Sequence, residues 1–317
     1  MKLSDLIQYR NQLEILSALP VWQTADLDLN VILHLISTHN IQFSECATQL
    51  IDKKHGIQQA FDSFEHTLTQ IKTQLDQQIE IAEKSWFQDS YEFYYKNMKE
   101  NVNHLTRRQP NLSAEAKAIY HTRILKHNSW HHAAMIVRPG VETFINDLVG
   151  CDPLYLIDTD HEFLKPAMNL YNQTYQNRLR PYVINEKLDE QILYQLPDAQ
   201  FGLIFCYNFF NFRPFEIVKR WLMESYQKLK PGGVLVMTYN DCDRYKAVLL
   251  VEQKYTCYTP GKMIRQWANI LGFEEIFCYH DDGPITWIEF KKPGESTSLR
   301  GGQALAEIIP KPVANSK

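Results

Sequence analysis

The spacing of hydrophobic residues changes character near residue 133. Before this point apolar positions recur at helical intervals, and after it short apolar runs alternate with amphipathic stretches. The clearest helical seam has a 4-3-4-3-4 spacing and is formed by Ile57, Phe61, Phe64, Leu68, Ile71 and Leu75. Such a seam places one apolar stripe along a helix, and Ile79, Ala82 and Trp86 continue it with a one-residue slip. We therefore predict a helical domain over residues 1–105 that contains a long, coiled-coil-like helix.

This long helix has two interpretations. Its apolar stripe can pack against another helix of the same chain, or it can join two copies of the chain as a homo-oligomer through residues 55–86. Three heptads are too few to distinguish the two packings, so both stay open. In either case the helical region differs in its hydrophobic pattern from the chain after residue 133.

Residues 106–132 are predicted to form a basic linker and helix. Pro110 ends the preceding helix, and Ser113 in "NLSAE" is placed to cap the next one. The segment carries one acid, Glu115, and its Lys and Arg residues are Arg107, Arg108, Lys117, Arg123 and Lys126. These charges either form a solvated helix face or provide a docking surface for an anionic substrate, nucleic acid included.

From residue 133 onward, apolar runs alternate with stretches of helical pattern. The runs are "AAMIV", "LYLID", "RPYVI", "FGLIFCYN" and "GVLVMTY", and the helical stretches are "VETFINDLV", "EFLKPAMNLYNQTYQN", "LDEQILYQL", "PFEIVKRWLMESYQKL" and "PGKMIRQWANIL". This alternation predicts an α/β domain over 133–292 with a parallel sheet and helices on both faces. The final runs, "EEIFCYH" and "ITWIEFKK", are separated only by "DDGP" and predict an antiparallel hairpin. Residues 293–317 are expected to be a flexible tail.

Composition limits the class of protein. The 317 residues are 44% hydrophobic and 22% charged, with a net charge of −4. This balance favours a globular protein with no general attraction for nucleic acid or anionic membranes. No apolar run approaches the ~20 residues that span a bilayer, and the N-terminal stretch has no signal-peptide core. No CxxC pair occurs, which argues against a zinc site or a disulfide framework and favours reduced thiols. The cysteines are Cys46, Cys151, Cys206, Cys242, Cys257 and Cys278.

Three stretches resemble class I S-adenosylmethionine (SAM) methyltransferases. "LPDAQFGLIFCYNFFNF" (196–212) is similar to that family's segment at the fourth strand. "KLKPGGVLVMTY" (228–239) is similar to its helix-turn-strand before the fifth, and "YTPGKMIRQWANILGFEEI" (258–276) to its helix before the sixth. The similarity covers roughly residues 130–292 and extends to phage-encoded methyltransferase-like proteins. It implies a Rossmann-like class I methyltransferase sheet, with SAM as cofactor and methyl transfer as activity.

The cofactor residues are expected just after the apolar runs, because open parallel sheets bind ligands beyond the carboxyl ends of their strands. A carboxylate at Asp158 can accept both ribose hydroxyls of an adenosine. The resemblance implies that Phe163 lies near the adenine and that Asn185 or Glu186 holds its amino group. Asp160 is expected to cap the next helix instead, and helix core is the alternative for Phe163.

The first loop departs from the family pattern. The resemblance implies an acid followed by three glycines in alternate positions, whereas this chain has Arg138, Pro139 and Gly140. Gly140 lies 18 residues before Asp158, a spacing similar to the family's. Two explanations stay open. Gly140 alone permits close approach of the cofactor, with Arg138 pairing to the cofactor's carboxylate, or the fold persists without cofactor as an assembly module.

Methyl transfer requires alignment of the acceptor and, for oxygen or nitrogen acceptors, removal of a proton. The polar residues after the fourth apolar run are Tyr207 and Asn208, expected to face cofactor and substrate. After the fifth run comes "YNDCDR" (239–244), where Asp241 and Asp243 are candidate bases within a polar cluster for substrate contacts. The Pro-Pro-aromatic run of amino-methylating DNA enzymes and the Pro-Cys nucleophile of cytosine-C5 enzymes are both absent from the fourth segment.

The sequence therefore predicts a SAM-dependent methyltransferase of the cytoplasm, or of the host cytoplasm for a phage-encoded protein. Its acceptor is unidentified, with a small molecule or protein favoured over nucleic acid, and neither a membrane partner nor a metal is expected. The alternative is a catalytically degenerate methyltransferase-like protein that acts in assembly through its N-terminal helices. A nicotinamide-dependent enzyme fits poorly, because the terminal hairpin and the "LKPGG" turn are not expected of it.

Overall fold

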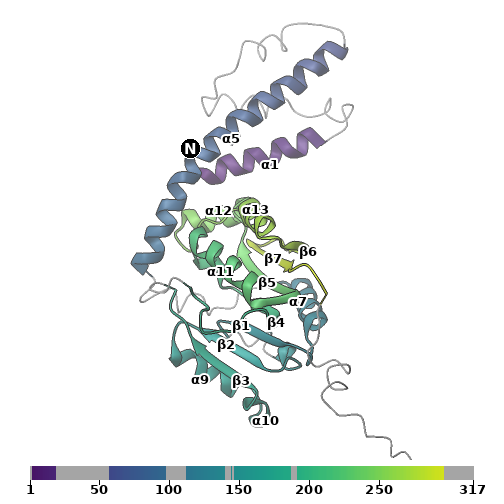
Figure 1. Cartoon of the computed structure of the whole chain (residues 1–317). Coiled ribbons are helices and arrows are strands. Elements are labelled where there is room, and N and C mark those ends of the chain that lie inside the picture. The colour runs from purple at the N-terminus through teal and green to yellow at the C-terminus, as the bar shows by residue number, and fades with distance from the viewer. Residues whose placement is uncertain are drawn as a thin grey trace, which may run out of the picture.

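The computed structural model describes residues 2–18, 57–97, 112–139, 144, 146–186 and 191–295. At its centre is a seven-stranded sheet in the order β3-β2-β1-β4-β5-β7-β6 (Figure 1). The strands are β1 Ala133–Val137, β2 Leu154–Asp158, β3 Leu179–Val183, β4 Phe201–Cys206, β5 Leu229–Asn240, β6 Glu274–His280 and β7 Ile285–Lys291. The helices are α1 Leu3–Ala18, α5 Ile57–Asn97, α7 Ala114–His127, α9 His161–Asn169, α10 Gln173–Gln176, α11 Phe215–Lys228, α12 Tyr245–Glu252 and α13 Gly261–Leu271, with 3-10 turns η1 Asn146–Leu148 and η2 Phe210–Phe212.

The direction of the strands confirms the predicted fold class. Strands β1 to β5 pair in parallel, and β7 pairs antiparallel with both β5 and β6. The turn of the hairpin is the predicted "DDGP", in which the Gly283 amide donates to the Asp281 carboxylate at 2.8 Å. The order of strands reverses between β1 and β4, because the chain builds outward to β3 and then returns to the other side of β1.

Two apolar cores cover the two faces of the sheet. Alternate residues of β4 show the division, since Leu203 and Phe205 belong to one core and Ile204 and Cys206 to the other. The first core is closed by α7, η1, α9 and α10, and the second by α11, α13 and the end of α5. Helices on both faces of a mostly parallel sheet are what the alternating pattern predicted.

Helices α1 and α5 lie side by side, and α1 also packs against α12 (Figure 1). They share a third core, which includes Leu6, Ile7, Ile71, Leu75, Ile79, Val248 and Val251. Ile71, Leu75 and Ile79 of the predicted seam are thus buried within one chain, and Leu68, Ala82 and Trp86 are partly buried against the same core, which agrees with the first of the two interpretations. Helix α12, "YKAVLLVE", was missed by the sequence analysis and buries Ala247, Val248 and Val251.

Helix α7 begins where the sequence predicts, since the Ser113 hydroxyl accepts the Ala116 amide at 3.0 Å. Its basic residues are not all solvated. Arg123 makes two hydrogen bonds to the fully buried Glu289 of β7, at 2.8 and 2.5 Å, and His127 lies 2.8 Å from the same carboxylate. The basic face of this helix is thus partly a structural contact with the sheet. Arg107 and Arg108 lie outside the described residues.

One predicted helix is wrong where the structure describes it. Residues 191–196 of "LDEQILYQL" form turns. The cause is a distant side chain, because the Glu224 carboxylate on α11 accepts the amides of Ile192 and Leu193 at 2.8 and 2.6 Å. The predicted helix "VETFINDLV" is described at Phe144 and from Asn146 onward, where η1 replaces a regular helix. The predicted tail lies mostly outside the described residues.

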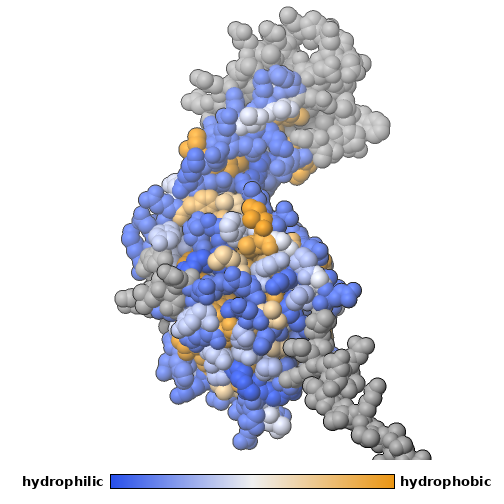
Figure 2. Space-filling view, in the orientation of Figure 1, coloured by the Kyte–Doolittle hydropathy of each residue, from blue (hydrophilic) through white to orange (hydrophobic). Residues whose placement is uncertain are grey.

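The visible surface is largely hydrophilic, with apolar residues in small separate groups (Figure 2). No helix in the described part of the chain is long and apolar enough to cross a membrane. Among the same residues, no group of three or more His, Cys, Asp or Glu side chains is arranged to hold a metal ion.

Candidate functional site

Four buried polar residues stand at the carboxyl ends of neighbouring strands. Arg138 follows β1, Asp158 ends β2, Asn208 follows β4 and Asn240 ends β5, and their exposures are 4%, 2%, 4% and 1%. These ends meet at one edge of the sheet, where the strand order reverses between β1 and β4. Because such a reversal opens a crevice for ligands, this edge is the candidate site.

Arg138, which stands where the family pattern has an acid before the glycines, adopts a left-handed backbone conformation. Its φ is 58°, in the left-handed region that costs a non-glycine residue about 1–2 kcal/mol. Its guanidinium lies 5.6 Å from the centre of the Phe209 ring and is close enough to Glu186 to lower the pKa of that carboxyl. The side chain is therefore oriented toward the interior beside β3 and β4. Gly140 lies outside the described residues.

Asp158 is held in a defined orientation at the edge. Its Oδ1 accepts the Thr159 amide at 2.7 Å and lies 3.5 Å from the Thr159 hydroxyl. Its backbone carbonyl accepts the Ile184 amide at 2.9 Å, and the Arg138 amide donates to the carbonyl of Ile157 at 2.6 Å. The backbone at the end of β2 is thus bonded to the first residues after β1 and β3, and Thr159 orients the Asp158 carboxylate.

The carboxylate of Glu186 accepts hydrogen bonds from several other side chains of the protein. Its carboxylate accepts Arg213 Nε at 3.3 Å and Nη2 at 3.0 Å, Trp221 Nε1 at 2.7 Å and the Tyr94 hydroxyl at 3.2 Å. Burial opposes ionisation, but Arg213 outweighs it and the pKa of Glu186 lies below its usual value. Glu186 therefore joins β3, α11 and α5. The other residue predicted to hold adenine, Asn185, is half-buried.

Helix α9 contains Phe163, the residue predicted to lie near the adenine. Asp160 caps this helix, as expected, by accepting the Glu162 amide at 2.9 Å. Phe163 is only partly buried, whereas its neighbour Leu164 is 1% exposed and belongs to the core. Phe163 is thus the residue of this pair that the fold leaves near the surface.

Tyr207 and Asn208 follow β4 and are both buried, but Tyr207 has aromatic neighbours and Asn208 has polar ones. Tyr207 lies in an aromatic cluster, 5.0 Å from Phe144 and 6.4 Å from Tyr120 between ring centres. Burial raises the pKa of Tyr207, so its phenol is neutral at physiological pH. Asn208 has a φ of 50°, its backbone amide donates to the Thr238 hydroxyl at 2.7 Å, and its side-chain Oδ1 accepts Asn211 Nδ2 at 2.9 Å.

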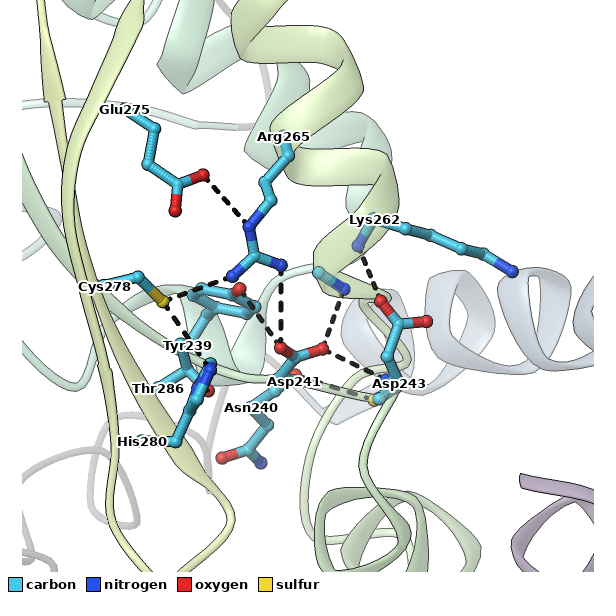
Figure 3. A network of polar contacts seen from close by, with 12 residues as sticks. Tyr239, Asn240, Asp241, Asp243, Lys262, Arg265, Glu275, Cys278, His280 and Thr286 are labelled. Carbon is cyan, nitrogen blue, oxygen red and sulfur yellow. Dashed lines mark hydrogen bonds and ion pairs between the residues drawn. The ribbon is translucent and has the colours of Figure 1, made fainter. Parts of the chain in front are cut away.

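Asp241 and Asp243 cap helix α13 (Figure 3). Asp241 Oδ1 accepts the Gly261 amide at 2.9 Å and the Asp243 amide at 3.1 Å, and Asp243 Oδ2 accepts the Lys262 amide at 2.6 Å. Arg265 lies 4.0 Å from Asp241. Carboxylates at a helix N-terminus satisfy unpaired amides and complement the helix dipole. Asp241 and Asp243, the predicted bases, therefore stabilise the N-terminus of α13.

Sequence reasoning missed one residue at this edge. Tyr120 of α7 is fully buried and stacks on Trp287 of β7 with 4.3 Å between ring centres. Its hydroxyl has no hydrogen-bond partner within the described ranges. The sequence signal was the helical spacing of Ala116, Tyr120 and Ile124, which predicts burial but not a polar role.

No protein-family model and no curated protein matches this sequence. Solved structures with a similar fold include the N-methyltransferase NodS from Bradyrhizobium japonicum WM9, at 13% identity, covering 56% of this chain and 97% of that one, with a TM-score of 0.42. A SAM-dependent methyltransferase from Mesorhizobium loti has 14% identity, covering 57% and 98%, with a TM-score of 0.43. An O-methyltransferase family 2 protein from Planctomyces limnophilus has 12% identity, covering 61% and 67%, with a TM-score of 0.42. These values carry no inference about what this chain binds, and none of the three supports a phage origin.

Proposed function

We propose that this chain is a SAM-dependent methyltransferase whose cofactor binds at the carboxyl ends of β1 and β2. The observation that carries the proposal is Asp158, a buried carboxylate oriented by Thr159 at the end of β2. It stands beside the strand-order reversal of a sheet that ends in an antiparallel hairpin, the fold that the sequence resemblance implies. The acceptor is a small molecule or a protein.

Some of the residues predicted to bind SAM are suited to parts of this cofactor, and others are not. A carboxylate such as that of Asp158 is the type of group that accepts two ribose hydroxyls, and Asn185 has a side chain of the type that pairs with an adenine edge. Glu186 does not fit the adenine role, because Arg213 and Trp221 hold its carboxylate. Arg138 lies over Phe209, an orientation that does not favour its predicted pairing with the cofactor's carboxylate.

SAM supplies a methyl group already activated on a sulfonium, so the chain has mainly to orient the acceptor and exclude water. The neutral phenol of Tyr207 can donate a hydrogen bond to the acceptor. Asn208, the next residue, is held at the end of β4 by Thr238 and Asn211. We assign no proton removal to Asp241 or Asp243, because both hold the first turn of α13.

Calorimetric titration of the full chain with S-adenosylhomocysteine tests this proposal. We expect binding in the wild type and a loss of about 1–3 kcal/mol in Asp158→Ala, the cost of a charge-assisted contact, which is about fivefold to 150-fold in affinity. Asp160→Ala is the matched control, because this nearby acid caps α9 and should leave affinity unchanged.

Two results decide against the proposal or its key residue. No detectable heat in the wild type at about 1 mM ligand, equivalent to a binding free energy weaker than about −4 kcal/mol, would leave the assembly role as the better hypothesis. Equal affinities for the wild type and Asp158→Ala would remove Asp158 from the site.

A further inference from the structure

We infer that a cavity between helix α5 and the turn after helix α12 binds a small zwitterion of the amino-acid class, with an apolar side chain. The cavity has a volume of about 220 Å³ and is lined by residues 86–96 of α5 and 251–256 of the facing segment. None of its lining residues belongs to the sheet edge of the proposed function. The inference therefore goes beyond that function and does not depend on it.

The lining of the cavity changes from buried to exposed. Ser90, Val251 and Thr256 are buried, at 4%, 2% and 6% exposure. Trp86 and Phe93 are partly buried and provide apolar walls. The exposed lining residues are all charged, and they are Asp89, Glu92, Lys96 and Lys254. An apolar interior with a few charged groups beside it is typical of sites for small molecules.

Hydrogen bonds hold the two sides of the cavity together. The Ser90 hydroxyl oxygen accepts the Tyr258 amide at 2.7 Å, and the Tyr258 hydroxyl donates to the Glu83 carboxylate at 2.9 Å. Ser90 and Glu83 are seven residues apart on α5, so the segment after α12 is attached to this helix at two turns. The cavity is therefore formed before a ligand arrives.

Two of the four exposed charges are available to a ligand. The Lys96 ammonium lies 3.0 Å from the Glu92 carboxylate, so these two neutralise each other. The side chains of Asp89 and Lys254 make no hydrogen bond or ion pair with another residue in the described ranges. The cavity thus has one available carboxylate on its α5 side and one available ammonium on the other side.

The backbone of Lys254 gives a second reason to assign its side chain a role. Its φ is 59°, its amide donates to the Val251 carbonyl at 2.9 Å, and the Tyr255 amide donates to the Leu250 carbonyl at 2.9 Å. This pair of bonds ends many helices, and glycine is the usual residue at the left-handed position. A lysine there is strained, and strain that persists in a fold is often associated with function.

The charge pattern selects a zwitterion. A ligand ammonium pairs with Asp89 and is attracted to the face of the Trp86 ring, while a ligand carboxylate pairs with Lys254. A ligand that is only cationic is repelled by Lys254, and one that is only anionic is repelled by Asp89. Both charges of an amino acid are therefore matched, and its side chain contacts the apolar walls.

The dimensions of the cavity limit the ligand to about one amino acid. A cavity of about 150 Å³ holds benzene, so 220 Å³ accommodates a phenyl ring with a short charged end. Trp86 and Phe93 are seven residues apart, which is about 10 Å along the helix axis. A peptide of several residues or a folded protein does not fit between them.

Calorimetric titration of the full chain with L-phenylalanine tests the inference. Phenethylamine is the purely cationic analogue and 3-phenylpropionate the purely anionic one, and all three have the same ring. We expect L-phenylalanine to bind more tightly than either analogue. Asp89→Asn should weaken L-phenylalanine and phenethylamine about twofold to fivefold, the effect of losing an exposed ion pair, and should not weaken 3-phenylpropionate.

The complementary variant is Lys254→Gln, which should weaken L-phenylalanine and 3-phenylpropionate but not phenethylamine. Lys254→Gly removes the same charge and relieves the strained backbone, so it should weaken L-phenylalanine while the melting temperature stays equal or rises. Lys84→Gln is the matched control, because Lys84 is on α5 outside the cavity and its side chain is 74% exposed. It should leave all three affinities unchanged, and thermal melting verifies that each variant is folded.

The outcomes separate this inference from the proposed function. No binding of L-phenylalanine at about 10 mM, tighter binding of either analogue, or unchanged L-phenylalanine affinity in Asp89→Asn or Lys254→Gln overturns the site. Loss of L-phenylalanine binding in Asp158→Ala also overturns it, because the amino acid then binds at the edge proposed for the cofactor. Binding that depends on Asp89 and Lys254 in a chain that does not bind S-adenosylhomocysteine upholds the cavity and refutes only the methyltransferase.

Discussion

The hydroxyl of Tyr94 on helix α5 donates to the carboxylate of Glu186 at 3.2 Å, joining residues 92 positions apart. Both side chains are buried, at 0% and 2% exposure. The contact ties the end of the long N-terminal helix to the residues after β3 at the candidate site. The helical region is thus part of the same packed structure as the edge of the sheet.

Tyr94→Phe should destabilise the protein by about 1–3 kcal/mol. The substitution keeps the ring and removes one donor from a buried carboxylate, whose desolvation is then less well compensated. Urea denaturation measures the change, with Tyr91→Phe as the control, because Tyr91 is on the same helix and 46% exposed. Equal stabilities of the two variants would show that the bond to Glu186 contributes nothing.

The stability contributed by Glu289 should be lost in acid. Burial opposes its ionisation, but Arg123, His127 and Trp287 outweigh burial and lower its pKa to about 2 from 4.5. A lowered folded pKa means that the stabilisation is complete above about pH 4.5 and declines as the pH falls toward 2. The difference corresponds to on the order of 3 kcal/mol at neutral pH.

Denaturation curves of wild type and Glu289→Gln check this sign. The stability advantage of the wild type should stay constant from pH 6 to about 4.5 and shrink as the pH falls from there to about 3.5, inside the window set by the two pKa values. Glu216→Gln on α11 is the control, because its side chain is 66% exposed and should show little difference at either pH. A wild-type advantage that grows in acid would contradict the assignment.

Asp241→Ala should cost about 0.5–2 kcal/mol through loss of the cap on α13. A matched cycle uses Gly261, because a Cβ at this position would lie 2.6 Å from both Asp241 oxygens. Gly261→Ala should therefore destabilise the wild type more than it destabilises the Asp241→Ala background. If the losses of stability caused by Gly261→Ala and Asp241→Ala are additive in chemical denaturation, the close approach of the new Cβ to the Asp241 carboxylate has no energetic consequence.

The apolar seam of α5 should stabilise a single chain. Leu75→Ala is expected to cost about 2–5 kcal/mol, because the side chain is 2% exposed in the core shared with α1 and α12. Ile81→Ala, on the same helix but 70% exposed, should cost little. Sedimentation of the full chain is expected to give the mass of a monomer for wild type and both variants. A dimer that dissociates in Leu75→Ala would instead support the oligomeric packing of residues 55–86.

Local patterns predicted the elements whose signals lie close together in the chain. The apolar runs before Arg138 and Asp158 became strands, and the "DDGP" turn became a hairpin. Ser113 and Asp160 were assigned as helix caps because each bonds an amide only two or three residues away. Interactions of this range depend on the local sequence, so the sequence alone determines them.

Roles that depend on partners distant in the chain required the tertiary structure. Glu224 withdraws Ile192 and Leu193 from a predicted helix across about 30 positions, and Arg213 and Trp221 engage Glu186 where a ligand contact was expected. Tyr120 has the helical spacing of a core residue, and only folding stacks its ring on Trp287.

The sequence by itself determined the α/β class, the order of the strands along the chain and the edge where a site was expected, because periodicity and turn chemistry are local. The tertiary structure decided which polar residues at that edge are consumed by the fold and which are left with unused hydrogen-bonding atoms. A carboxylate or a phenol has the same intrinsic chemistry in either situation. Its role depends on the neighbours that folding brings within hydrogen-bonding distance.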